Sequence, residues 1–151
     1  MHKILPALLA CFALALLGLA PVRAAEDPLK ADHAKLQGKW KSTIAGANGQ
    51  SFTTLEFKGD KSILHITNKD GGTIFKGESD FKLEKAGKFK VYTYSNLKVL
   101  AGENEGQTLY ADGKNKSSIY KFDGDVFVTV GGVREDDEDK PRLVRWEKLT
   151  Q

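Results

Sequence analysis

Cysteine is almost absent from this sequence, since Cys11 is the only one among its 151 residues. It lies in an apolar run from Ile4 to Leu19, which follows the short basic head Met1-His2-Lys3. Val22 and Ala24 then supply the small residues that signal peptidase accepts before its cleavage site. We therefore expect a signal peptide over residues 1–24, cleaved after Ala24, and one mature domain over residues 25–151.

The loss of Cys11 with the signal peptide would leave a mature chain without cysteine. This excludes disulfides, cysteine nucleophiles and thiolate metal sites in that domain. An exported domain without disulfides is more typical of a bacterial envelope, so we expect a secreted or periplasmic protein. The apolar run is short for a membrane span, and we expect no stable membrane insertion. Leu8-Leu9-Ala10-Cys11 loosely resembles a lipoprotein signal, but the apolar run continues beyond Cys11, which argues against lipidation.

A large net charge is also missing. The expected signal peptide contains Lys3 and Arg23 and no acidic residue, so 21 of the 23 Lys and Arg residues remain in the mature domain against 20 Asp and Glu. Nearly balanced charge gives no general attraction to nucleic acid or to anionic membranes. We therefore expect no nucleic-acid partner.

Groups that carry catalysis are scarce. The mature chain has two histidines, His33 and His65, in different expected elements. Nothing resembles a serine nucleophile elbow, a zinc-binding helix or a phosphate-binding loop. The acidic run at residues 135–139 could attract calcium, but it lacks the spacing and closing Glu of a preorganised loop. We expect a protein that is not an enzyme, with no cofactor and no metal site.

Short strands separated by Gly, Asp and Asn turns make up most of what is present. Asp27-Pro28 is a helix start and Gly38 a natural stop, which predicts one short N-terminal helix. Strands are expected at residues 39–44, 51–58, 62–67, 73–83, 88–94, 107–110, 117–122, 126–130 and 142–149. This order predicts an all-β fold, a small antiparallel up-and-down barrel of about eight strands. Residues 95–116 form the least regular region.

Three motifs occur in an order that resembles a known family. They are Leu36-Gln37-Gly38-Lys39-Trp40, Gly106-Gln107-Thr108-Leu109, and Ile119 to Asp125 with Asp123-Gly124-Asp125 at its end. The order is similar to that of a lipocalin-like domain family of small secreted bacterial proteins of unknown function. The resemblance implies that Trp40 closes the barrel floor and that Arg145, or Arg142, packs across it in a structural role.

Three functions are open for such a domain, of which an envelope enzyme is the least favoured because the sequence has no catalytic motif. The first is the binding of a small, mostly apolar ligand inside the barrel, without catalysis. The inward-facing residues expected to line that cavity are Leu55, Phe57, Phe89, Val91, Tyr120, Phe122 and Val128. The alternative is a packed barrel that serves as a protein-interaction module for a cell-envelope partner. In that case exposed Tyr92, Tyr94 and Tyr110 would be anchors, because tyrosine is enriched at interfaces.

Overall fold

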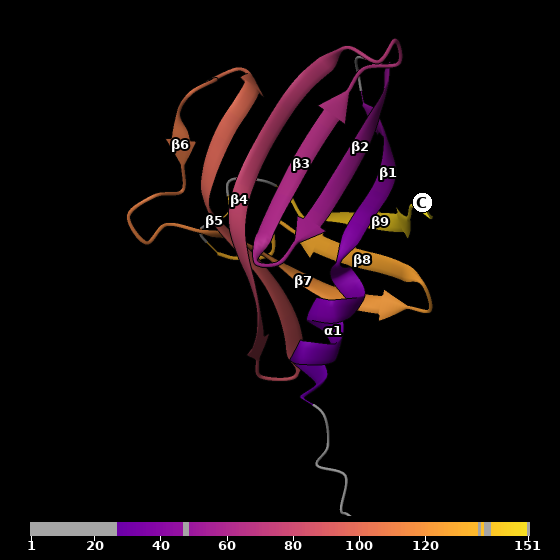
Figure 1. The fold of residues 1–151 in the computed structure, drawn as a ribbon. Coiled ribbons are helices and arrows are strands. Elements are labelled where there is room, and N and C mark those ends of the chain that lie inside the picture. The colour runs from indigo at the N-terminus through magenta and orange to yellow at the C-terminus, as the bar shows by residue number, and fades with distance from the viewer. Residues whose placement is uncertain (1–26, 47–48, 136, 138–139, 151) are drawn as a thin grey trace, which may run out of the picture.

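The computed structural model describes residues 27–46, 49–135, 137 and 140–150. The expected signal peptide and most of the acidic run lie outside the described residues. One helix is followed by nine strands (Figure 1): α1 (Pro28–Leu36), β1 (Gly38–Gly46), β2 (Gly49–Lys58), β3 (Lys61–Thr67), β4 (Thr73–Ala86), β5 (Phe89–Gly102), β6 (Thr108–Leu109), β7 (Lys116–Asp123), β8 (Val126–Gly131) and β9 (Arg142–Lys148).

Eight of these strands close into an antiparallel up-and-down barrel. The sheet runs β4-β3-β2-β1-β9-β8-β7-β5, and an additional β4–β5 pairing closes it, while the two-residue β6 lies along β5. The expected all-β barrel with one short N-terminal helix is therefore confirmed. No described helix is long and apolar enough to cross a membrane.

Strand β5 is longer than the sequence pattern indicated. It continues from Phe89 through Gly102, into the region that reads as irregular. The break in alternation comes from Asn96, which has a positive φ of 50°, opposite a register shift between Glu78 and Asp80 of β4. This bulge moves Leu97 and Val99 to the buried side of the strand, where an unbroken alternation would not place them.

Aromatic side chains fill the barrel interior. Trp40, Phe57 and Phe127 are almost fully buried, and Phe57 meets Phe81, Tyr92 and Phe127 edge-on. The cluster of buried side chains comprises Leu36, Trp40, Leu55, Phe57, Phe81, Tyr92, Tyr120, Phe127 and Trp146. Such rings each bury a large apolar area, so this cluster holds together a domain that has no disulfide among its described residues.

Helix α1 packs against one end of the barrel (Figure 1). Leu36 at its end is buried, and its carbonyl oxygen accepts a 2.6 Å hydrogen bond from Trp40 Nε1. Asp32 accepts hydrogen bonds from Lys90 Nζ at 2.6 Å and from the Tyr120 hydroxyl at 2.9 Å. His33 stacks on Phe81. The helix is thus tied to strands β1, β4, β5 and β7 and covers the end of the aromatic cluster.

Candidate functional site

Four of the seven residues expected to line a ligand cavity lie in the barrel interior. Leu55, Phe57 and Tyr120 belong to the buried cluster, and Phe122 packs against it. Their side chains contact one another and the neighbouring rings; Phe122, for example, lies 5.5 Å from Phe127 between ring centroids. These four side chains are therefore part of the packed core.

The other three expected lining residues, Phe89, Val91 and Val128, lie on the outer side of the sheet and not in the barrel interior, although Val128 is only 4% exposed there, and this part of the prediction is corrected. Val91 pairs with Ile119, while its neighbour Tyr92 is buried in the core. Phe89 follows the same alternation, and Val128 alternates with the inward Phe127. Directly opposed residues share a face of the sheet, so the register fixes these positions. The sequence was ambiguous in β5 because both of its faces carry apolar residues.

The tyrosines expected as exposed anchors are largely covered. Tyr92 is buried and its hydroxyl is hydrogen-bonded to Ser62 at 3.0 Å. Burial raises the pKa of Tyr92 to about 12. Tyr94 and Tyr110 are half-buried and pack edge-to-face on each other. The prediction that Tyr92 is an exposed anchor is therefore wrong.

Lys148, and not Arg145, provides the cation that lies over the Trp40 ring. Its Nζ lies 5.2 Å from the centroid of the Trp40 ring. Arg145, to which the family resemblance gave this part, lies on the outer face and forms an exposed ion pair with Asp123 at 3.6 Å. The alternation in β9 explains the difference, because Lys148 shares a face with the buried Trp146 and Arg145 does not.

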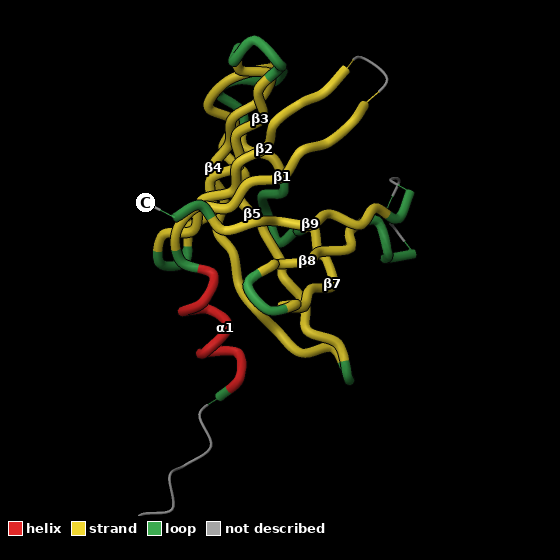
Figure 2. Tube along the Cα trace, turned by 90° about the vertical axis from the view of Figure 1, so that its right-hand side faces the viewer, coloured by secondary structure: helices red, strands yellow, loops and turns green. Residues whose placement is uncertain are grey.

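The barrel wall is weakest between β1 and β9. Among the described residues these strands pair at Trp40↔Lys148 and Lys41↔Glu147, with one further hydrogen bond from the Leu149 amide to the Lys39 carbonyl oxygen, and beyond Lys41 they diverge (Figure 2). A cavity of about 540 Å³ lies at this opening. We call it the seam cavity; its lining residues are Lys41, Ser42, Thr43, Arg142, Leu143, Val144, Arg145 and Glu147.

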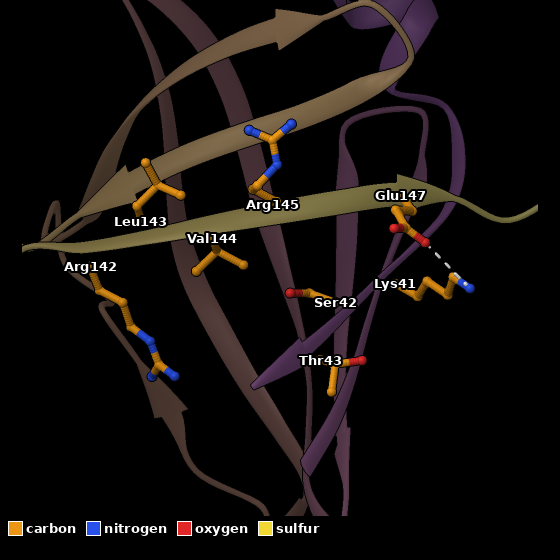
Figure 3. A pocket seen from close by; sticks show the side chains of 8 residues that line it. All are labelled: Lys41, Ser42, Thr43, Arg142, Leu143, Val144, Arg145 and Glu147. Atoms are coloured by element: carbon orange, nitrogen blue, oxygen red, sulfur yellow. Dashed lines mark ion pairs between the residues drawn. The ribbon is translucent and has the colours of Figure 1, made fainter. Parts of the chain in front are cut away.

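Positive charge predominates in the seam cavity. Lys41 is neutralised by Glu147 at 3.4 Å, whereas the ion pair of Arg145 is with Asp123, which is not a lining residue. Within the described part of the chain, Arg142 has no ion-pair partner. The two arginines extend on opposite sides of β9, while Val144 and Ser42 point toward the space between the strands (Figure 3).

A buried hydroxyl without a partner lies beside this cavity. Thr53 is 2% exposed, and its Oγ1 has no hydrogen-bond partner among the described residues. Thr53 is directly opposite Ser42, a lining residue, in the β1–β2 pairing, so both side chains are on the inner face. Buried hydroxyl groups are nearly always hydrogen-bonded in proteins, and this one is available to a polar group that enters from the seam.

The two histidines of the mature chain and the buried Tyr120 are not lining residues of the seam cavity. His65 Nε2 is hydrogen-bonded to Thr73 Oγ1 at 2.9 Å on the β3–β4 pair, and His33 Nε2 is hydrogen-bonded to Asp60 Oδ1 at 3.1 Å. Burial and the neighbouring Asp32 carboxylate raise the pKa of Tyr120. Among the described residues, no cluster of three or more His, Cys, Asp or Glu side chains could hold a metal ion.

Comparisons of the chain with protein-family models, with curated proteins and with solved structures give no match. The closed eight-stranded antiparallel barrel is compatible with lipocalin-like folds. Sequence reasoning did not find the seam cavity, because its existence depends on where the pairing of β1 and β9 stops. The one sequence signal related to the site was the alternation of residues 142–148, since it places Val144 and Arg145 on opposite faces of the strand.

Proposed function

We propose that this chain is an exported, non-catalytic, lipocalin-like binding protein for a small amphipathic molecule that carries an acidic group. The observation that carries the proposal is the cationic seam cavity. Its volume of about 540 Å³ is within the usual range for small-molecule sites. A guanidinium group matches a carboxylate or a phosphate in two parallel hydrogen bonds, which suits Arg142 to recognise the acidic group.

The seam cavity, and not the barrel centre, is the place we assign to the ligand. The aromatic cluster occupies the interior, so a ligand there would have to displace packed rings. At the seam, Leu143 and Val144 offer apolar surface and Ser42 offers a hydroxyl. A polar atom of the ligand that reached Thr53 Oγ1 would also satisfy that buried group, which adds affinity.

Two further observations support the lipocalin-like assignment and the export. The Gly38-Lys39-Trp40 motif forms the start of β1, the first strand of a closed antiparallel barrel, as the family pattern implies. The basic head, apolar run and small residues before position 25 have the form of a signal peptide. A secreted or periplasmic binding protein is the role that joins these features.

The alternative function is a packed interaction module for an envelope protein. The filled interior favours it, because such a barrel has only its surface to offer. The two functions predict different outcomes for the purified protein, which would contain a bound ligand in the first case and none in the second. Native mass spectrometry of the mature protein, taken from its own host without organic extraction, would show a discrete extra mass for a ligand-holding protein and a bare polypeptide for the module.

A fluorescent fatty acid tests the proposed function directly. We expect 11-(dansylamino)undecanoic acid to bind the mature protein saturably at one site, with fluorescence enhancement. The methyl ester of the same acid, which keeps the alkyl chain and lacks the negative charge, should bind at least about tenfold more weakly, because a charge-assisted hydrogen bond contributes about 1.5–3 kcal/mol.

Matched variants locate the site of this probe. Arg142→Gln should weaken binding of the acid about tenfold and leave that of its methyl ester unchanged. Lys69→Gln, which removes an exposed cation in the β3–β4 turn, is the control and should change neither. Non-saturable binding, or equal loss in both variants, would contradict the proposed site.

A further inference from the structure

A continuous apolar surface crosses the outer face of four strands. The pairing register places Val91 of β5, Ile119 of β7, Val130 of β8 and Leu143 of β9 in one row. Phe89 lies next to this row and is 46% exposed, and Leu143 is 61% exposed. Large apolar side chains are usually shielded from water, so two protruding ones on a shared face indicate a contact surface.

A shallow hollow lies within this surface. Its volume is about 390 Å³, and Phe89, Ile119 and Val128 supply apolar side chains to its lining. The other lining residues are Tyr120 and three lysines: Lys88, Lys90 and Lys121. None of the described residues that line the hollow is acidic. We call the hollow together with the apolar row the basic apolar face.

Two of the lysines at this face are free to bind an anion. Lys90 is held by Asp32 at 2.6 Å, but Lys88 and Lys121 have no ion-pair partner within the part of the chain that the structure describes. Lys88 Nζ instead lies over the Phe89 ring at 5.4 Å. Two acidic residues lie close to this face: Asp123 is paired with Arg145, and Glu84, directly opposite Val91, is paired with Lys82 at 2.9 Å. The face therefore has excess positive charge beside exposed apolar groups.

We propose that the basic apolar face docks the protein peripherally on an anionic lipid surface. Phe89 and Leu143 enter the boundary between the headgroups and the acyl chains, and the ammonium groups of Lys88 and Lys121 remain at the level of the lipid phosphates. Apolar insertion combined with attraction to anionic headgroups is the general physics of reversible membrane-surface binding.

Charge complementarity favours a lipid surface over a second copy of the chain. Two basic apolar faces packed together would bring unpaired lysines of both copies into one interface, which costs free energy. The nearly balanced net charge of the mature domain gives no general attraction to membranes. The fold creates a local attraction, because Lys121 of β7 and Lys88 of the turn before β5 line the same hollow.

Vesicle sedimentation tests the proposal. The mature protein is mixed with vesicles of phosphatidylcholine alone, or of phosphatidylcholine and phosphatidylglycerol in equal amounts, at low salt. We expect binding only to the anionic vesicles and its loss at about 1 M salt, where the Debye length falls to about 3 Å. Equal binding to both vesicles, or to neither, would overturn the proposal.

Variants then identify the face. The double variant Lys88→Gln with Lys121→Gln should reduce the partition coefficient about 25-fold, since each lysine near an anionic surface contributes about fivefold. Phe89→Ser should also reduce it several-fold. Matched controls are Lys69→Gln with Lys114→Gln, which removes two exposed loop lysines, and Ile74→Ser, which removes an apolar side chain that is 51% exposed on β4.

The controls should bind vesicles like the wild type. If they lose as much binding as the face variants, the attraction is not specific to this face and the proposal fails. Sedimentation velocity without lipid tests the competing occupant. A dimer that Phe89→Ser abolishes would assign the face to a second copy and would likewise overturn the lipid assignment.

Discussion

Lys148 Nζ lies 5.2 Å from the centroid of the Trp40 ring and donates a 2.9 Å hydrogen bond to the carbonyl oxygen of Lys35. One side chain at the end of β9 thus contacts the first strand and the last turn of α1. Trp40 continues the connection, because its Nε1 donates to the Leu36 carbonyl oxygen. These contacts join α1 and the first strand to the last strand, where the β1–β9 pairing closes the barrel.

The first prediction concerns which cation stabilises this closure. Lys148→Met should lower the free energy of unfolding by about 1 kcal/mol, since it removes a cation–π contact and a hydrogen bond at a partly exposed site. Arg145→Met removes only an exposed ion pair and should cost less than about 0.5 kcal/mol. Urea unfolding followed by circular dichroism measures both. A larger loss for Arg145→Met would show that the arginine, as the family resemblance implied, is the important cation.

The second prediction concerns Trp40 itself. Trp40→Phe should lower the free energy of unfolding by about 2–4 kcal/mol, because it leaves the buried Leu36 carbonyl oxygen unsatisfied and creates a cavity. Amide hydrogen exchange should show faster opening of α1 than of β7. Phe52→Leu, at an exposed aromatic on β2, is the control and should change stability little. Unchanged exchange of α1 in Trp40→Phe would contradict the role of this bond in docking the helix.

The fold could be predicted because local signals agree along most of the chain. In β2 the alternation of Thr53, Leu55 and Phe57 with more polar neighbours identifies the inner face, and the structure buries all three. Gly-containing turns separate the strands, and their order leaves few alternatives to an antiparallel meander. The short helix follows from the Asp27 cap, whose carboxylate accepts from the Leu29 amide.

The candidate site could not be predicted because it depends on long-range pairing. In β5, Phe89 and Val91 compete with Tyr92 and Tyr94 for the inner face, and only the register with β7 decides between them. The seam cavity exists because β9 leaves β1 after Lys41, and no local pattern marks that point. The alternation of residues in β9 does predict the face of Arg145 correctly, because it places Arg145 on the face opposite to Trp146.

The third prediction is a loss of stability in alkali. The pKa of Tyr92 is raised to about 12 by burial, and that of Tyr120 is raised by burial and by Asp32. A raised tyrosine pKa means that the native state favours the neutral form, so its stabilisation is complete below pH about 10 and is lost as the pH rises toward 12. Each group contributes up to about 1.4 kcal/mol per pH unit in that window.

Tyrosinate absorbance and urea unfolding between pH 8 and about 12 check this expectation. Of the four tyrosines, the native protein should ionise Tyr92 and Tyr120 only when it unfolds. Tyr92→Phe should reduce the alkaline loss of stability, although it also removes the hydrogen bond to Ser62. Ionisation of all four tyrosines near pH 10 in folded protein would contradict the burial that the structure gives these hydroxyls.

The fourth prediction separates stability from binding at Thr53. Because its buried hydroxyl lacks a partner, Thr53→Val should raise the free energy of unfolding by about 1 kcal/mol. The matched control is Thr129→Val, which removes a buried hydroxyl that accepts a 3.0 Å hydrogen bond from Trp146 Nε1 and should destabilise by about 1–3 kcal/mol.

Natural proteins often retain a destabilising polar group where function needs it. Thr53→Val should accordingly weaken binding of the dansyl fatty acid at the seam cavity, while Thr129→Val should leave it unchanged in folded protein. A gain in stability with unaltered binding would show that the Thr53 hydroxyl is not part of the ligand site.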